Sequence, residues 1–485
     1  MLVSLYSSRV ILSALGVEDF GINNVVAGFV MFLAFFKSSL SNASQRYLSI
    51  GLGKKDIQAT TIYFRQSNTL MLTFCAGVLI LAETIGLWFV CNKLVIPEER
   101  MTAALWIYQF AIISTICSII QVTYVADIIA QERMGIYAYL GIFEAITRLL
   151  IAFMIEWTVS IDRLILFGLL TAFVSVITLI IHIAYCKSKF KETNLKLTWN
   201  KLLLKEMSKF ISANLFGCIA WSASLQGVNI LLNIFFGPIV NAARGIAMQV
   251  NGAVASFANN IMTAMKPQII KSYASNDIEY MKTLIEKSSK YITMITLLFS
   301  LPLIVETEFV LKLWLGQVPE YTVEYIRIVL INLIFLELTT PLWIVANATG
   351  KIVRQQFNGR IITLLALPIS YTTLLILKDP LIPILIEVSC NIAYWLYCLN
   401  DTHRQINLDI RKYFIKSILP CVYIVIVVAT GYQLLNLAHI ENTILKFFTS
   451  CSVILILFVS SSYLSLNQSE KQFVKSQIGK LRKNK

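Results

Sequence analysis

Charged residues are scarce in this chain of 485 residues. Asp, Glu, Lys and Arg make up 14% of it, whereas hydrophobic residues make up 57%. A soluble globular domain carries about a quarter charged residues. Together with a mean hydropathy of +0.71, this scarcity excludes an ordinary soluble protein and indicates a membrane protein.

Motifs for catalysis and metal binding are also missing. The sequence has no HExxH, no paired-aspartate motif and no serine elbow, and its three histidines are His182, His403 and His439. Its nine cysteines include no CxxC and fall mostly in apolar runs, as small buried hydrophobic residues do. The predicted extracytoplasmic loops span only about ten residues, too few to assemble reacting groups. We therefore expect no enzyme, no metal site and no resident cofactor.

A signal peptide is not expected either, because no basic region and cleavage site are found near the start of the sequence. The first apolar stretch, LVSLYSSRVILSALG, is shorter than the roughly 20 residues that cross a bilayer. We expect that the first helix lacks part of its N-terminal half.

Long apolar runs dominate the rest of the sequence. Residues 70–91 and 164–186 are long enough for membrane-spanning helices and too long for the alternating strands of a barrel. The predicted fold is all-α and polytopic, with about 14 transmembrane helices. They lie near 1–16 (partial), 22–44, 67–92, 101–127, 135–156, 163–186, 209–234, 241–265, 291–315, 326–347, 361–377, 382–400, 417–436 and 444–464.

The basic residues are sorted between the two sides of the predicted bundle. Alternate loops and the C-terminal tail hold 30 of the 41 Lys and Arg residues. Lys and Arg are retained on the cytoplasmic side, so both termini are predicted to face the cytoplasm. Because the formal charge of +14 is gathered in these segments, it does not indicate a nucleic-acid partner.

An internal repeat divides the chain. A shift of 221 residues aligns Gly16 with Gly237, Ala43 with Ala264, Asp56 with Asp277 and Ser67 with Ser288. Two six-helix halves related in this way have the same orientation, as in transporters that bind cargo between two repeats. The predicted domains are an N-lobe (1–186), a cytoplasmic amphipathic linker (187–208), a C-lobe (209–400), a final helix pair (401–464) and a basic cytoplasmic tail (465–485).

The linker is rich in lysine, with seven between positions 187 and 209. We expect it to lie on anionic lipid headgroups, although a basic amphipathic segment can also bind a protein partner.

Several predicted helices carry a polar face with a buried cation. A cation near the middle of a membrane costs about 3 kcal/mol, so it usually faces water or a partner. Small polar side chains can instead be hydrogen-bonding contacts between helices, and this reading stays open for each asparagine. A cavity lined by Arg, Lys and amides suits an anionic ligand that carries hydroxyl groups. The predicted substrate-binding residues are Arg9, Lys37, Asn229, Arg244, Gln249, Asn251 and Asn259.

Acidic residues within the spans have two possible roles. Glu83, Asp127 and Glu306 could exchange H⁺ or Na⁺ as coupling groups, but their scatter over separate helices forms no compact ion site. Glu144 and Arg148 are four residues apart, and this spacing favours a structural ion pair on one helix.

Three stretches of the chain resemble a known family. They are LYSSRVILSALGVEDFGINNVV (5–26), LLNIFFGPIVNAARGIAMQVNGAVASFANNIMTAMKPQIIKSYA (231–274) and LKLWLGQVPEY (311–321). They are similar to Wzx-type polysaccharide flippases of the multidrug/oligosaccharidyl-lipid/polysaccharide exporter (MOP) superfamily. The resemblance implies a V-shaped bundle of two six-helix lobes that alternates access and has a cationic cavity.

The resemblance also implies a cargo and a location. The cargo would be an oligosaccharide repeat unit of O-antigen, capsule or exopolysaccharide on undecaprenyl pyrophosphate. A monomer in the bacterial inner membrane would move it from the cytoplasmic to the periplasmic leaflet, with polysaccharide polymerase machinery as a candidate partner. The alternative is a cation-coupled multidrug exporter of the related MATE branch, for which we expect acidic residues in the cavity. A purely structural membrane protein would have little use for the buried charge.

Overall fold

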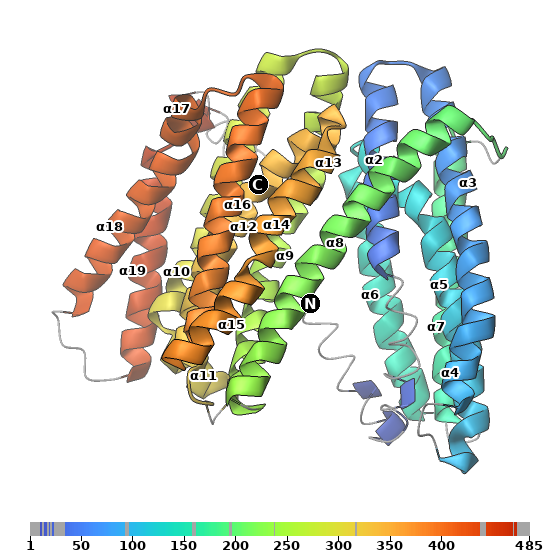
Figure 1. Cartoon of the computed structure of the whole chain (residues 1–485), viewed down its shortest axis with the longest axis horizontal. Coiled ribbons are helices and arrows are strands. Elements are labelled where there is room, and N and C mark those ends of the chain that lie inside the picture. The colour runs from blue at the N-terminus through green and yellow to red at the C-terminus, as the bar shows by residue number, and fades with distance from the viewer. Residues whose placement is uncertain are drawn as a thin grey trace, which may run out of the picture. The chain divides into compact units, whose positions relative to one another are not determined.

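The fold is all-helical. The computed structural model describes residues 10–11, 14–16, 19, 22–23, 34–92, 97–157, 162–193, 196–236, 238–315, 318–436, 443–468 and 470–472. Every regular element among them is a helix (Figure 1). Within these described ranges, eleven helical stretches are long and apolar enough to cross a membrane. The chain is therefore a polytopic membrane protein, as its composition predicts.

The chain forms two compact units. Unit 1 comprises Met1–Ile219 and Ile270–Asn276, and unit 2 comprises Ala220–Ile269 and Asp277–Lys485. Two of the three divisions fall inside long helices, α8 (Lys201–Phe236) and α9 (Pro238–Ala274), and the third lies in the turn after α9. The predicted linker at 187–208 is not one separate helix, because α8 already begins at Lys201.

Unit 1 is built from five long helical stretches in addition to the start of α8. The second of them, α3, continues through a π-helical turn at Ala82–Gly86 into α4. The bounds are α2 (Ala34–Gly53), α3 (Ile57–Leu81), α4 (Leu87–Asn92), α5 (Met101–Ala130), α6 (Met134–Trp157) and α7 (Arg163–Lys189).

Unit 2 holds the rest of α8 and α9 and the remaining helices. Two further π-helical turns, Gln355–Gly359 and Phe414–Ile418, interrupt its spans. The bounds are α10 (Ile278–Val305), α11 (Thr307–Leu315), α12 (Thr322–Thr349), α13 (Ile352–Arg354), α14 (Arg360–Leu364), α15 (Ala366–Leu377), α16 (Ile382–Ile406), α17 (Ile410–Tyr413), α18 (Leu419–Asn436) and α19 (Thr443–Leu464).

One pair of residues aligned by the internal repeat has the same structural role in both halves. Asp56 caps α3 by accepting a hydrogen bond from the backbone N–H of Ala59, and Asp277 caps α10 in the same way through Tyr280. The residue before each cap is left-handed, with φ of 56° at Lys55 and 61° at Asn276. The repeat therefore preserves a complete turn between two helices.

One apolar core cluster of unit 2 draws on several helices. It joins Val228 and Leu232 of α8 and Ala247 of α9 to Tyr325 of α12 and Ile384 of α16. The small side chains of α9 let it approach the bulkier helices closely, as is common between membrane helices. This packing fixes the rotation of α9 and so decides where its polar face points.

Candidate substrate cavity

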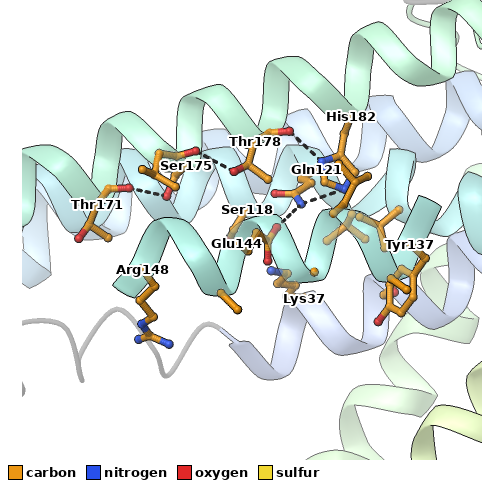
Figure 2. A pocket seen from close by; sticks show the side chains of 18 of the residues that line it. Lys37, Ser118, Gln121, Tyr137, Glu144, Arg148, Thr171, Ser175, Thr178 and His182 are labelled. Atoms are coloured by element: carbon orange, nitrogen blue, oxygen red, sulfur yellow. Dashed lines mark hydrogen bonds between the residues drawn. The ribbon is translucent and has the colours of Figure 1, made fainter. Parts of the chain in front are cut away.

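A cavity of about 900 Å³ lies within unit 1, between α2, α5, α6 and α7. Its walls mix apolar side chains with hydroxyl, amide and charged groups (Figure 2). The polar lining residues are Lys37, Ser38, Ser41, Ser118, Gln121, Tyr137, Glu144, Arg148, Thr171, Ser175, Thr178 and His182.

Helix α7 presents a stripe of hydroxyl groups to the cavity. Thr171, Ser175 and Thr178 follow one another at helical spacing, and each hydroxyl donates to the carbonyl four residues earlier, at 2.8 to 2.9 Å. A hydroxyl that donates to its own helix keeps its oxygen lone pairs for other partners. The stripe can therefore accept hydrogen bonds from a ligand that carries hydroxyl groups.

Gln121 of α5 joins an acid to a base across the cavity wall. Its amide nitrogen lies 3.3 Å from Oε1 of Glu144 and 3.3 Å from Nε2 of His182. The other ring nitrogen of His182, Nδ1, lies 2.7 Å from the backbone carbonyl oxygen of Thr178. These contacts tie α5, α6 and α7 together at the cavity (Figure 2).

Two cations and one carboxylate make the charged part of the described lining. They are Lys37 on α2 and Glu144 and Arg148 on α6. With His182 neutral, these groups sum to one positive charge. This net positive charge favours an anion over a cation in the cavity. The preference is strengthened because charges interact more strongly at short range and away from bulk water.

The chain is similar to known proteins in its fold but not in its sequence. No protein-family model matches the chain, and no curated protein matches it by sequence. An outward-facing multidrug resistance MATE family transporter of the MOP superfamily superimposes with a TM-score of 0.73 at 12% identity, over 84% of this chain and 92% of that one. The chain has the MATE fold.

Two more solved structures support the assignment of the MATE fold. A MATE protein in the bent conformation gives a TM-score of 0.68 at 13% identity, over 84% of this chain and 91% of that one. A MOP superfamily transporter from Pyrococcus furiosus gives 0.71 at 13% identity, over 84% and 93%. The latter is described as having a binding pocket of reverse polarity that suggests a different function.

Within the MATE fold, the predicted cationic residues have different surroundings. Lys37 lines the unit 1 cavity, and its role in substrate binding stays a prediction. Arg244 is 2% exposed within unit 2, and its Nη2 lies 2.9 Å from Oε2 of Glu387 on α16. The structure therefore corrects the prediction for Arg244, because a carboxylate from a distant helix offsets its charge. Arg9 lies outside the described residues.

The predicted polar residues of α8 and α9 do not line the unit 1 cavity. Asn229 donates to Oε1 of Gln226 at 3.0 Å, within its own helix. Gln249 and Asn259 are exposed on α9, and Asn251 is half-buried there. Their role in substrate binding stays a prediction.

The predicted ion pair between Glu144 and Arg148 does not form. Both residues are described, and the ion pairs of the described chain do not include one between them. Instead, Glu144 accepts from Gln121, and Arg148 points away from it (Figure 2). The prediction was wrong because a hydrogen-bond donor on α5 competes with the neighbour four residues away.

The three candidate coupling acids lie away from the cavity lining. Glu83 accepts from Gln109 at 3.3 Å, and Asp127 is fully buried and accepts from Thr193 at 3.3 Å. Glu306 follows α10 at its C-terminal end in unit 2. None of them contacts another, so their role in ion exchange stays a prediction.

Gln121 and His182 are among the cavity residues that the sequence analysis did not predict. The sequence analysis found no metal or catalytic motif around His182. A signal was present, since Thr171, Ser175, Thr178 and His182 form a polar stripe on an otherwise apolar helix. That stripe identifies the face of α7 that meets the cavity.

Proposed function

We propose that the protein is an alternating-access transporter that moves an oligosaccharide on a polyprenyl pyrophosphate from the cytoplasmic to the periplasmic leaflet of the bacterial inner membrane. The observation that carries this proposal is the pair of cations, Lys37 and Arg148, on the wall of a cavity of about 900 Å³ rich in hydroxyl groups. The protein itself would act as a monomer and not as an enzyme.

The lining matches the two chemical parts of such a cargo. A guanidinium group binds phosphate oxygens through two parallel hydrogen bonds, and an ammonium group binds them as a point charge. The hydroxyl stripe of Thr171, Ser175 and Thr178 offers acceptors to sugar hydroxyls. The volume is at the upper end of the range of about 300–1,000 Å³ that is usual for small-molecule sites.

The MATE fold supports transport as the general activity, because the similar structures are described as transporters. One of them is described in terms of a pocket whose reverse polarity suggests a different function. Pocket charge is therefore a reasonable criterion for the cargo of this chain, and here the described cavity lining has an excess of one positive charge.

Cation-coupled multidrug export is the second candidate. It is favoured by Glu144, a carboxylate on the cavity wall, and by the MATE transporters among the similar structures. In that case the carboxylate would bind a cationic drug or a coupling H⁺ or Na⁺, and Lys37 and Arg148 would be dispensable.

Binding to the purified protein distinguishes the two candidates. We expect undecaprenyl pyrophosphate to bind more tightly than a cationic dye. Lys37→Ala and Arg148→Ala should each weaken the binding of inorganic pyrophosphate about tenfold, because each loses a charge-assisted contact. Lys37→Arg should retain most of the affinity, and Lys351→Ala, a change at an exposed loop lysine, should have no effect.

The opposite result would support drug export. Tighter binding of the dye, lost on Glu144→Gln and unaffected by Lys37→Ala, would contradict the proposal. In cells, deletion of the gene should make a lipid-linked oligosaccharide accumulate on the cytoplasmic leaflet.

A further inference from the structure

Glu144 shares the cavity with Lys37 and Arg148 but forms no ion pair with either of these described residues. This needs a reason, because an acid and a base four residues apart on a helix usually attract each other. In Figure 2 a dashed line joins the carboxylate of Glu144 to the side-chain amide of Gln121.

The hydrogen bonds of Gln121 supply that reason. A carbonyl oxygen only accepts, so the 2.7 Å contact with Thr178 requires that Nδ1 of His182 carries the hydrogen. A neutral imidazole then presents a lone pair at Nε2. The amide nitrogen of Gln121 has two hydrogens, one for Nε2 of His182 and one for Oε1 of Glu144, both at 3.3 Å.

We infer that Gln121 and His182 are positioning residues that keep Glu144 from forming an ion pair with Lys37 or Arg148, which leaves both cations available to an anionic cargo. His182 fixes the orientation of the amide, and the amide fixes the carboxylate. This inference rests on the proposed function, because it assigns a purpose to the two cations. It adds that the anion affinity of the cavity is set by residues that do not touch the anion.

The arrangement depends on the charge of His182. The groups that face the cavity with it are Glu144, Arg148 and Tyr137 from α6 and Lys37 from α2, while α5 adds Gln121 and Ser118 to the described lining. A proton on Nε2 would turn this nitrogen into a donor. Gln121 would then have to present its carbonyl oxygen, and Glu144 would lose its amide donor.

Acid should therefore weaken anion binding. Once released, Glu144 would pair with Lys37 or Arg148 at contact distance and neutralise it. The new charge on His182 does not compensate, because this residue is 3% exposed and both ring nitrogens are already hydrogen-bonded. Charge interactions fall with distance, so the loss of a contacting cation outweighs the gain of a more distant one.

A double-mutant experiment with full-length protein and inorganic pyrophosphate tests the inference. At about pH 7.5, well above the ordinary histidine pKa, Gln121→Leu should weaken binding about fivefold or more. Adding Glu144→Gln should restore wild-type affinity, because the group that neutralises the cations is gone. A Gln121→Leu protein that binds as wild type does, or that Glu144→Gln does not restore, overturns the inference.

The pH profile separates this role from a merely structural one. Once the pH is low enough to protonate His182, wild-type affinity should fall relative to the Glu144→Gln variant. The ratio of the two affinities does not depend on the titration of pyrophosphate, because both proteins bind the same ligand at each pH. A constant ratio contradicts the inference.

Failure of the proposed function has a different signature. If wild-type protein binds no pyrophosphate, or if Lys37→Ala leaves binding unchanged, the proposed function fails. The hydrogen bonds from His182 through Gln121 to Glu144 are then tested by nitrogen-15 NMR. The sample is the His403→Gln/His439→Gln protein, in which His182 is the remaining histidine. We expect the neutral ring to carry its proton on Nδ1, and a proton on Nε2 would overturn the inference.

Discussion

At the scale of single residues, the buried guanidinium of Arg244 is a charge that the fold must compensate. Its charge is met by Glu387 at 2.9 Å, and its side chain is 2% exposed. Among the described residues, Nε and Nη1 of Arg244 have no hydrogen-bond partner. One carboxylate therefore carries most of the compensation for a cation inside the helix bundle of unit 2.

Removal of that carboxylate should be costly. We expect Glu387→Gln to lower the free energy of unfolding by about 3 kcal/mol or more, because it leaves an uncompensated buried charge. Equilibrium unfolding of the purified protein in detergent measures the change.

A matched control is the exposed pair between Arg327 and Glu308, which are separated by 3.7 Å and 40% and 66% exposed. Glu308→Gln should change the free energy of unfolding by less than about 1 kcal/mol. If the two variants were equally stable, solvent or another group would have to neutralise Arg244.

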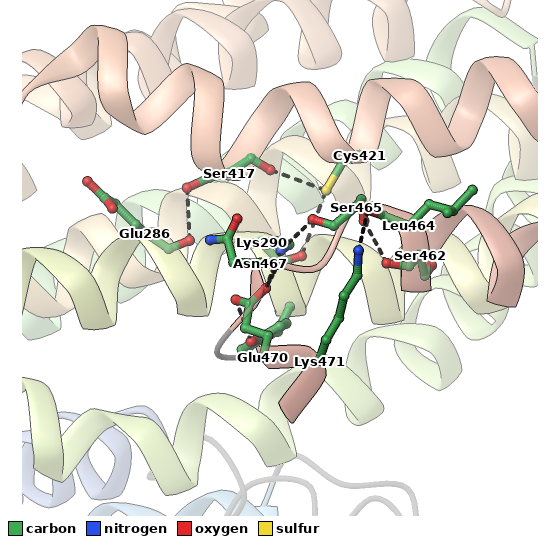
Figure 3. A network of polar contacts seen from close by, with 11 residues as sticks. Glu286, Lys290, Ser417, Cys421, Ser462, Leu464, Ser465, Asn467, Glu470 and Lys471 are labelled. Carbon is green, nitrogen blue, oxygen red and sulfur yellow. Dashed lines mark hydrogen bonds and ion pairs between the residues drawn. The ribbon is translucent and has the colours of Figure 1, made fainter. Parts of the chain in front are cut away.

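At the scale of elements, the segment that follows α19 is tied to α10 by a buried ion pair (Figure 3). Nζ of Lys290 lies 2.8 Å from Oε2 of Glu470 and 3.1 Å from the carbonyl oxygen of Ser465. The hydroxyl of Tyr291 donates to the same carboxylate at 2.7 Å, and the backbone N–H of Asn467 donates at 2.8 Å. A single acidic side chain thus fastens the end of the described chain to unit 2.

The pKa of Glu470 makes this attachment sensitive to acid. Burial raises the pKa, but the hydrogen bonds from Lys290, from the Asn467 backbone and from Tyr291 outweigh it and hold the pKa below its ordinary value. A depressed carboxyl pKa stabilises the fold above the ordinary value of about 4.3. This stabilisation is lost as the pH falls through the lower value of the folded protein.

Glu470→Gln should reproduce the acid state at neutral pH. We expect faster amide hydrogen exchange in residues 465–472, measured by mass spectrometry, because the segment loses its charged anchor. Glu279→Gln is the matched control, since Glu279 is 85% exposed although its oxygen also lies 2.7 Å from a lysine. Equal exchange in Glu470→Gln and wild type would show that apolar packing alone holds the segment.

At the scale of the whole molecule, the chain passes between its two units twice inside a helix and once in a turn. It leaves unit 1 within α8, re-enters it for Ile270–Asn276 at the end of α9, and leaves again before α10. The basic residues of the loops predict which ends of these helices face the cytoplasm. The orientation of the chain in the membrane can therefore be tested separately at each loop.

Cysteine labelling checks the predicted orientation. Cys91 is an exposed native cysteine next to a loop that we predict to be extracytoplasmic. A membrane-impermeant maleimide should label it in intact cells after the outer membrane is opened. In a Cys91→Ser protein, Lys378→Cys should be labelled in the same way, whereas Lys351→Cys should react only after the inner membrane is permeabilised.

The reverse pattern would invert the predicted topology. It would also place the proposed cargo on the wrong side for export, so this measurement bears on the function as well as on the fold.

The sequence predicted where helices lie more accurately than where they end. The expected spans at 101–127 and 382–400 correspond to α5 (Met101–Ala130) and α16 (Ile382–Ile406). Their starts agree, and the observed helices run a further 3 and 6 residues at the predicted cytoplasmic ends. Apolar composition marks the hydrocarbon region alone, whereas backbone hydrogen bonding continues into the headgroup region.

The sequence grouped Lys37 with polar residues of α8 and α9, whereas the structure lines the cavity around Lys37 with Gln121, Glu144 and His182. Gln121, Glu144 and His182 come from three helices, and their contacts depend on how each helix is rotated about its axis. Periodicity defines the polar face of one helix, but it does not say which other polar face it meets.

The helical spans, and the repeat whose aspartates cap α3 and α10, could be predicted from the amino-acid sequence, because hydrophobicity and capping act over a few neighbouring residues. The partner that compensates each buried charge could be found only in the folded protein. Arg244 meets Glu387, 143 residues away, while Glu144 accepts from Gln121 and does not pair with Arg148. The partner of a buried charge depends on how the helices pack. This packing brings together residues that are far apart in the sequence and share no local sequence pattern.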